Sequence, residues 1–586
     1  MTFATETASL SRTPVTLVKI TLDKCSLTYG VGACTASAAA GAECYNTYPT
    51  CQDRANYALS TKVYKFQDLE APLTISDARP YLSSIDWMAT EIKPGKLTVK
   101  GRILLTFEDE PDTDVGIDPY VATRASVQGT FWKKLVARNP NYKGRRCEVY
   151  QGYLGLAEGD FELRWAGNLE TVKISRGKVK VEVVDEIQKL EDYSIPPKLK
   201  MELAAGIADV ATTLTVTDAD GLPAAGYILV DEEVIGYASK TGTVLETLTR
   251  GAFGTTAVVH DEGTKVDPAV YYAPANPFDI MEAMLTNAAD FATESNPGAE
   301  IPAARVDSTA FADAKDYPGD EQNVSALVIK STKISKLLFE LAELTDCSVW
   351  VNEAQKITIR RNNIPNRGGR VYTALNDDEH ILERSGAVDL NEESRKSRVV
   401  LYWDKNVLAE DDDKPEGYNS IEVVVDADAE SVNEYNGITE HVIYSRWLRR
   451  SWEAYAEIEY LRNFAQNMAA RRLANSRDAQ TVLSFSVELK DEGVLVGDYV
   501  EITTDEYQTV AGADLVGRFS IWKRDAKDGK VALSAVRIRS RKIGIIADDT
   551  LTNEFTSATT AEKEYGFIAT TATAQMSDGT DAYRIY

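Results

Sequence analysis

Four of the six cysteines lie within the first 51 residues of this 586-residue chain. Cys25, Cys34, Cys44 and Cys51 follow the spacing C-x8-C-x9-C-x6-C, which lacks the close C-x2-C pairs of common zinc ribbons and fingers. The residues between them are mostly small or turn-forming, so this segment buries little apolar area and needs another source of order. Four thiolates on one metal centre would supply that order.

Two kinds of metal centre suit four thiolates. A [4Fe-4S] cluster takes four cysteines that converge from loops, and zinc takes the same four ligands around one tetrahedral ion. We expect a metal centre, with the iron–sulfur cluster favoured over zinc; paired disulfides and unrelated free thiols are the other interpretations. The N-terminus has neither the basic nor the apolar region of a signal peptide. A chain made in the cytosol can receive a cluster there, which favours metal over disulfides.

Other catalytic signatures are missing from the sequence. The three histidines, His260, His380 and His441, lie in different segments. The chain has no H-E-x-x-H, G-x-S-x-G or Walker A motif and no glycine motif for dinucleotides. Acidic pairs are so numerous that none marks a glycosidase dyad. We therefore expect a structural protein and no enzyme, with a cell-wall-degrading enzyme as the alternative.

The composition is strongly acidic. The chain has 64 Lys and Arg against 90 Asp and Glu, a net charge of −26. A DNA-binding protein would instead present a basic face to phosphate. The charge suits a protein that DNA passes without sticking, although solubility is the more common reason for such a charge. No apolar run is long enough to span a bilayer.

Short strands separated by turn residues dominate the chain, which predicts antiparallel sheets or barrels. The clearest runs are 97–107, 172–184, 357–361, 398–403 and 421–425, with a late set at 483–488, 498–503, 518–523 and 530–538. Three helices are also predicted. Asn276 and Pro277 open the first, leucines at helical spacing mark the second over 334–344, and the third is long, over 452–473.

The predicted fold class is mainly β with α+β parts: several β-barrel domains, cysteine-rich cluster-binding loops and a small inserted β domain. The predicted domains are a barrel domain with the cysteine loops at 1–204, the inserted domain at 205–268, an α+β domain at 269–400, a helix with a β-barrel at 401–545 and an extended arm at 546–586. The acidic run at 410–415 is expected to be an exposed loop, since it lacks the ligand spacing of an EF-hand.

Several segments carry a family resemblance. Residues 22–34, Leu-Asp-Lys-Cys-Ser-Leu-Thr-Tyr-Gly-Val-Gly-Ala-Cys, and residues 43–53, Glu-Cys-Tyr-Asn-Thr-Tyr-Pro-Thr-Cys-Gln-Asp, resemble the tail hub proteins of long-tailed phages and gene transfer agents, and the cysteine-rich part of the phage lambda tail tip protein L. The stretches 129–140 and 146–153 and the late Gly-Asp-Tyr-Val-Glu-Ile strand are also similar to these proteins. Cys147 and Cys347 fit no part of the pattern and are expected to be ordinary buried cysteines.

The resemblance implies a cofactor, an assembly and a location. In that family four cysteines bind an iron–sulfur cluster, so it implies a [4Fe-4S] cluster on Cys25, Cys34, Cys44 and Cys51. It implies a homotrimer in the virion, at the tail tip or baseplate, that closes the sixfold tail tube with a pseudo-sixfold ring of barrels. The implied partners are a distal tail protein, the tape-measure protein and a central tip or fibre protein, with phage DNA passing through the lumen. The 205–268 domain is expected to project outward, for host attachment or as a spacer.

Overall fold

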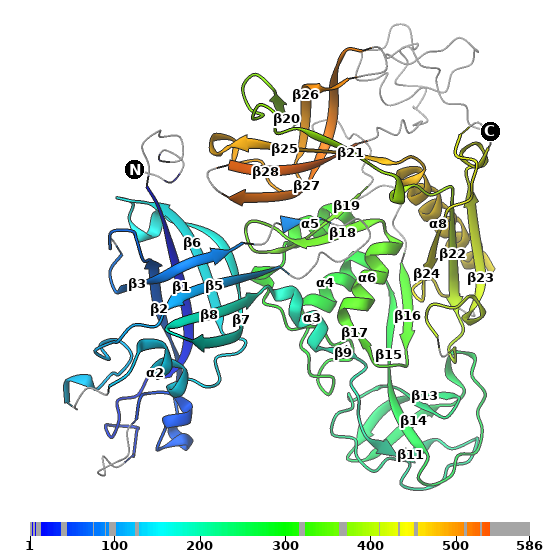
Figure 1. Cartoon of the computed structure of the whole chain (residues 1–586). Coiled ribbons are helices and arrows are strands. Elements are labelled where there is room, and N and C mark those ends of the chain that lie inside the picture. Colours follow the sequence, from blue (N-terminus) through cyan, green and yellow to red (C-terminus); the bar gives the residue numbers. More distant parts are fainter. Residues whose placement is uncertain are drawn as a thin grey trace, which may run out of the picture.

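The structure, a computed structural model, describes residues 3, 6, 13–36, 44–73, 75–87, 90–92, 101–123, 128–315, 323–362, 372–409, 411–431, 434–450, 455–508, 512–527 and 530–538. These residues form a closed barrel, a small β module, an α+β core, a three-stranded sheet with a long helix, and an open seven-stranded sheet (Figure 1). No helix in this part of the chain is both long and apolar enough to cross a membrane.

The N-terminal barrel closes in the order β1-β2-β3-β5-β8-β7-β6. Its strands are β1 (Pro14–Cys25), β2 (Leu59–Asp68), β3 (Ala78–Asp86), β5 (Arg102–Glu108), β6 (Arg146–Tyr153), β7 (Glu162–Ser175) and β8 (Lys178–Val184). Neighbouring strands are antiparallel except β2 and β3, and β6 pairs with β1 to complete the ring. Buried and more exposed residues alternate along β8, as expected for a barrel strand whose every second side chain points inward.

Helix α2 (Phe131–Arg138) packs side chains into the barrel core. Its Trp132 stacks on Phe66 with ring centroids 5.0 Å apart and lies 4.8 Å from Phe107. Asp109 fixes the start of the helix, because its carboxylate accepts the Trp132 N–H at 3.1 Å and the Thr130 hydroxyl at 2.7 Å. The interior of the barrel at this level is therefore a packed core of side chains.

The small β module forms a sheet in the order β10-β15-β12-β13-β14-β11. Its strands are β10 (Met201–Glu202), β11 (Thr213–Thr215), β12 (Gly226–Val230), β13 (Glu233–Thr241), β14 (Val244–Thr249) and β15 (Lys265–Ala275). Met201 pairs with Val266 and Glu202 with Lys265, so the two ends of the module lie side by side. The later part of β15 pairs with β16 (Val324–Val328), which joins the module to the α+β core through one shared strand.

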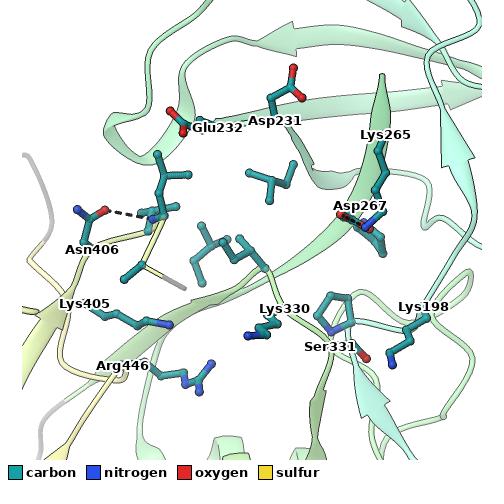
Figure 2. Close-up of a pocket in the computed structure, with 18 of the residues that line it drawn as sticks. Lys198, Asp231, Glu232, Lys265, Asp267, Lys330, Ser331, Lys405, Asn406 and Arg446 are labelled. Carbon is teal, nitrogen blue, oxygen red and sulfur yellow. Dashed lines mark hydrogen bonds and ion pairs between the residues drawn. The ribbon is translucent and has the colours of Figure 1, made fainter. Parts of the chain in front are cut away.

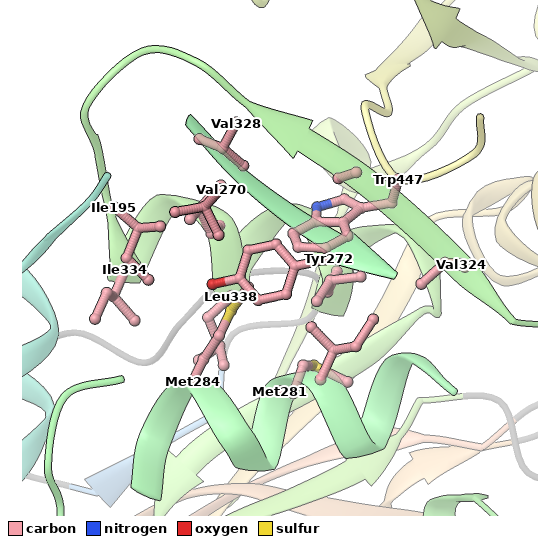
Figure 3. Close-up of a cluster of buried hydrophobic side chains, with 14 of the residues drawn as sticks. Ile195, Val270, Tyr272, Met281, Met284, Val324, Val328, Ile334, Leu338 and Trp447 are labelled. Carbon is pink, nitrogen blue, oxygen red and sulfur yellow. The ribbon is translucent and has the colours of Figure 1, made fainter. Parts of the chain in front are cut away.

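The α+β core packs helices against β15 and β16 (Figure 3). It contains α3 (Lys189–Asp192), α4 (Pro277–Thr286), α5 (Ser308–Lys315), α6 (Ile334–Leu344), β9 (Ser194–Ile195), β17 (Thr332–Lys333), β18 (Cys347–Val351) and β19 (Ile357–Arg361). Asn276 caps α4 as predicted, since its side chain accepts the Phe278 N–H at 3.0 Å. Tyr272 and Trp447 meet in this core with ring centroids 5.3 Å apart.

A long helix covers the three-stranded sheet β23-β22-β24. The elements are β22 (Arg398–Lys405), β23 (Tyr418–Val425), α7 (Ala427–Glu430), β24 (Glu440–Tyr444) and α8 (Tyr455–Ser476). Helix α8 confirms the predicted third helix and runs three residues beyond the expected end; the first residues of that prediction, 452–454, lie outside the described residues. Its Arg462 binds Glu422 at 2.9 Å, so this arginine contacts its own sheet.

The C-terminal sheet is open among the described residues, where the sequence predicted a barrel. Its strands are β20 (Thr373–Asn376), β21 (Ala387–Asn391), β25 (Gln480–Glu488), β26 (Tyr499–Gln508), β27 (Asp514–Lys527) and β28 (Lys530–Arg537). The late set of four predicted strands is confirmed as β25 to β28. The short strand β4 (Thr90–Glu91), from the N-terminal region, also pairs with β27. This distant pairing binds the barrel region to the C-terminal sheet.

Three local predictions can be compared with the structure. Cys147 and Cys347 are fully buried, as expected. The strand expected at 97–107 is observed from Arg102, and 97–100 lie outside the described residues. The expectation of an exposed acidic loop at 410–415 is wrong for Asp412, whose side chain is 13% exposed and binds three cations. Burial beside Lys and Arg side chains turns this carboxylate into a structural group.

Candidate metal centre

All four N-terminal cysteines lie at one end of the barrel. Cys25 is the last residue of β1 and lies opposite Leu59, near the start of β2. Because β1 and β2 are antiparallel neighbours, the connection between them leaves and returns at the same end, and it holds the other three cysteines. Cys44 is buried, and the other three are partly exposed. Residues 37–43 of this connection lie outside the described residues.

Backbone N–H groups point at three of the four sulfurs. The pairs are Gly30 N–H with Cys34 Sγ, Asn46 N–H with Cys44 Sγ and Asp53 N–H with Cys51 Sγ, each at 3.4 Å. Such donors stabilise negative charge on sulfur, whether the sulfur is a free thiolate or a metal ligand. Gly30 reaches this geometry with φ of +67°, a left-handed conformation that a glycine adopts without strain.

Two polar side chains tie the loops together. Asn46 donates from Nδ2 to the carbonyl oxygens of Cys25 and Leu27, both at 3.3 Å. Asp53 accepts the N–H of Thr35 at 2.7 Å and its hydroxyl at 2.8 Å, which joins the loop of Cys34 to the loop of Cys51. These bonds place the cysteine loops against each other without an apolar core of their own.

The four thiols lie within electrostatic reach of one another. Burial raises the pKa of the Cys44 thiol, the Asn46 N–H lowers it, and negative charge on Cys51, Cys34 and Cys25 raises it further. Positive charge is also close. Lys24 is 8% exposed, and burial and the neighbouring Lys62 lower its pKa to about 8, against the effect of Cys44. A cation near a thiolate stabilises its negative charge.

Tyr57 contributes an orphaned polar group. Its hydroxyl is buried and has no hydrogen-bond partner in the described part of the chain. Burial raises the pKa of Tyr57 to about 12, and the charges of Cys25 and Cys51 contribute to this rise. A buried donor without an acceptor is costly, so it fits a site that gains acceptor atoms when a group binds there.

The donor set fits a group held by four thiolates. All six cysteines are free thiols. As they stand, no three His, Cys, Asp or Glu side chains within the described ranges are placed to hold a single metal ion. The loops would therefore have to draw closer on loading, as in sites where metal binding and folding are coupled. The N–H donors, the Tyr57 hydroxyl and Lys24 supply the surroundings that such a centre needs.

Sequence reasoning missed the residues that surround the cysteines. Asn46, Asp53 and Tyr57 lie between or just after the cysteines in sequence, and this proximity is the only signal that marks them. The three histidines stay apart from this centre. His260 lies in the module between Asp231 and Glu233, and His441 lies on β24 beside Glu343.

Solved structures resemble this chain only at low sequence identity. No family model and no curated protein matches the chain. The 43 kDa tail protein of prophage MuSo2 from Shewanella oneidensis is similar in structure, with 12% identity, a TM-score of 0.33 and coverage of 78% of this chain and 95% of that one. The tail protein from Neisseria meningitidis MC58 has 11% identity, a TM-score of 0.34 and coverage of 77% and 92%.

A chain from the virion of a native gene transfer agent particle is also similar. It has 15% identity, a TM-score of 0.30 and coverage of 58% of this chain and 83% of that one. With identities and scores this low, function has to be argued from the residues of the chain itself.

Proposed function

We propose that this chain is a structural hub of a phage tail tip and carries a [4Fe-4S] cluster on Cys25, Cys34, Cys44 and Cys51. The observation that supports the proposal is the placement of these four cysteines in the loops at one end of the closed barrel, with N–H donors on three sulfurs. These loops are also the part of the sequence that resembles tail hub proteins. On this proposal the chain has no catalytic role.

The role assigned to the cluster is structural. When bound, it would supply four metal–thiolate bonds that cross-link loops with little core of their own. Asn46 and Asp53 would hold these loops near the bound geometry, and Lys24 would offset negative charge. The Tyr57 hydroxyl would donate a hydrogen bond to a sulfur of the centre, which accounts for its burial without a partner.

The proposed assembly is a homotrimer within the tail tip. Each chain offers two large β units, the closed barrel and the open C-terminal sheet, so three copies would place six units around one axis. Phe66, Phe107 and Trp132 fill the barrel, so DNA would pass between chains and not through a barrel. A net charge of −26 would repel phosphate from this passage. A distal tail protein, the tape-measure protein and a tip or fibre protein are the proposed neighbours.

Metal analysis of the purified full chain tests the cluster. We expect iron and sulfide and a broad absorbance near roughly 400 nm, as thiolate-bound Fe–S centres show. Replacing any one of the four cysteines by Ser should bleach this absorbance, whereas Cys347→Ser, a buried cysteine far along the chain, should retain it. One zinc per chain without iron would instead establish the zinc alternative.

The assembly and the absence of activity need separate tests. A symmetry-averaged cryo-EM map of the tail tip should show three copies around the tail axis, and a ring of six copies would reject the trimer. A zymogram on cell-wall material should show no clearing. Clearing by the pure chain would favour the alternative, a tail-associated cell-wall-degrading enzyme.

A further inference from the structure

A second site lies far from the cysteines, where the β module, the α+β core and the loop after β22 meet (Figure 2). It is a cavity of about 850 Å³. The module contributes the β12–β13 turn and the start of β15, the segment between β9 and β10 contributes residues 196–200, and the core contributes residues 327 and 329–331. The end of β22 and the loop after it contribute residues 405–409 and 411. The cavity is large enough for several side chains of a bound segment.

The lining combines aliphatic surface with positive charge. Its aliphatic part includes Leu199, Leu229, Leu327, Ile329, Val407 and Leu408. Five lysines and two arginines line the cavity against three aspartates and one glutamate, an excess of three positive charges in a chain of net charge −26. Lys198, Lys330, Lys405 and Arg446 lie on one side, and Asp231 and Glu232 lie on the other (Figure 2).

Part of this positive charge is rigidly held. Arg446 is 5% exposed and binds the carboxylate of Glu340 at 2.8 Å and that of Asp412 at 2.7 Å. Lys405 and Lys336 bind the same Asp412 carboxylate. Three cations therefore share two carboxylates, which leaves this side of the cavity with a net positive charge.

The remaining charge is available to a ligand. Lys198 and Lys200 are exposed, and neither makes a hydrogen bond or ion pair within the described residues. Asp231 on the opposite side is already occupied, because its carboxylate lies 2.9 Å from His260 Nδ1. A bound carboxylate would therefore find free ammonium groups at Lys198 and Lys200.

The lining selects the class of ligand. It contains no Phe, Tyr, Trp or His side chain, so it lacks the stacking surface that holds nucleic acid bases. Aliphatic side chains and prolines beside lysines and arginines match a peptide that carries both aliphatic and acidic residues. A segment of mixed aliphatic and acidic character occurs in this chain at 545–555, Ile-Ile-Ala-Asp-Asp-Thr-Leu-Thr-Asn-Glu-Phe, outside the described residues.

We propose that the cavity binds residues 545–555 of a second copy of this chain. Six residues separate Ile538, the last described residue, from Ile545, and the chain between these two positions reaches at most about 25 Å. The sheet that contains β28 lies at the opposite end of the molecule from the module, so a neighbouring copy is the donor (Figure 1). This inference rests on the proposed function in one respect, because it requires copies of this chain to assemble with one another.

A labelled synthetic peptide of residues 545–555 tests the cavity. The protein is the full chain with Asp548→Asn, Asp549→Asn and Glu554→Gln, so that its own segment does not compete. We expect saturable binding in fluorescence anisotropy that weakens with added salt. A peptide with the same three neutral substitutions should bind at least tenfold more weakly. No saturable binding, or equal binding of the neutral peptide, would overturn the proposal.

Pocket variants locate the binding. Lys198→Glu with Lys200→Glu should weaken the peptide at least tenfold, because both side chains are exposed and free of internal partners. Lys180→Glu, on the exposed side of β8 in the barrel, is a control on a distant surface and should leave binding unchanged. Equal effects of the two changes would mean non-specific charge attraction and would reject the site.

The donor is tested on the assembled wild-type chain. Excess peptide should lower the assembled fraction in mass photometry, and binding without this effect would reject the second copy as donor. Peptide binding does not depend on the cysteines, so it can succeed where the cluster analysis fails. Loss of peptide binding in a protein that retains iron and sulfide would reject this inference and leave the proposed function in place.

Discussion

Asn46 and Cys25 hold each other through two hydrogen bonds. The Cys25 N–H donates to the backbone carbonyl of Asn46 at 2.7 Å, and Asn46 Nδ2 donates to the carbonyl of Cys25 at 3.3 Å. The N–H of Asn46 also points at the Cys44 sulfur. Its backbone has φ of +57°, which asparagine tolerates better than most residues. One residue thereby links the end of β1 to the second cysteine loop.

Replacing Asn46 should loosen the cysteine loops. Asn46→Ala removes the side-chain bonds and puts alanine in a left-handed conformation, so we expect a loss of about 2 kcal/mol in the free energy of unfolding of the barrel region. Asn46→Gly is the matched control, because it relieves the backbone strain and removes only the side-chain bonds. Unfolding in urea measures the free energy of unfolding of both variants. Equal stability of Asn46→Ala and the wild type would contradict this role.

Metal loading should depend steeply on pH. Burial and the neighbouring cysteines raise the pKa of Cys44, so in the metal-free protein its thiol stays protonated at neutral pH and has to release a proton on binding. Affinity should therefore fall as pH falls from 8 to 6, by about tenfold per pH unit for each proton released. Competition with a chelator at several pH values measures this metal affinity. A flat profile would mean that the thiols do not need to deprotonate.

Glu233 should support the β module through a buried charge network. Its side chain is fully buried and accepts hydrogen bonds from Arg250 at 2.8 Å and from the N–H of Gly251 at 2.9 Å, with His260 Nε2 at 2.9 Å. Glu233→Gln should destabilise the module by about 3 kcal/mol, because Arg250 loses its buried partner. Faster hydrogen–deuterium exchange across residues 226–249 would report this loss of stability. Unchanged exchange there would show that the network is dispensable.

The same network should make the module acid-sensitive. Burial alone would raise the pKa of Glu233, but hydrogen bonds from Arg250, His260 and two backbone N–H groups hold it at about 2, below the value of about 4.3 for an unfolded Glu. The stability due to this group is therefore complete above about pH 5 and is lost as pH falls toward 2. Glu233→Gln should flatten this dependence. An identical acid transition in both proteins would exclude Glu233 as its source.

Two buried tyrosines should respond oppositely to loss of the hydroxyl. The Tyr237 hydroxyl donates to the carbonyl of Pro223 at 3.1 Å, whereas the Tyr272 hydroxyl has no partner within the described residues. Tyr237→Phe should cost about 1 kcal/mol, and Tyr272→Phe should be neutral or stabilising by about 1 kcal/mol. Thermal melting of both variants tests the contrast. A destabilised Tyr272→Phe would point to an undetected partner for its hydroxyl.

Local structure followed from the sequence wherever neighbouring residues decide it. The alternation over 172–184 predicts the β7–β8 hairpin, and Arg176 and Gly177 both take positive φ at its turn, as such tight turns require. Asn276 and Pro277 likewise predict the start of α4, because a cap and a fixed φ act within one turn. The buried state of Cys147 and Cys347 was also foreseeable from residue type.

Long-range pairing was decided only by the tertiary structure. The pairing of β4 with β27 joins residues more than 400 positions apart, and no local pattern encodes such a partner. The C-terminal strands were each predicted, but strand order decides whether a sheet is open or closed. The burial of Asp412 was also decided by the tertiary structure. Its acidic neighbours in sequence suggest exposure, but Arg446 and Lys336, which lie far away in sequence, pack against it and bury it.

The cysteine centre depends on both the local sequence and the tertiary structure. Residue type and spacing determined that four thiols crowd one short segment, because cysteines amid small residues leave few other sources of order. Only the folded barrel brings the loops to one end, since β1 and β2 must pair before their connection can close. The orphaned Tyr57 hydroxyl and the cationic Lys24 enter the site through that closure, because burial and the nearness of charge are properties of the fold and not of the sequence.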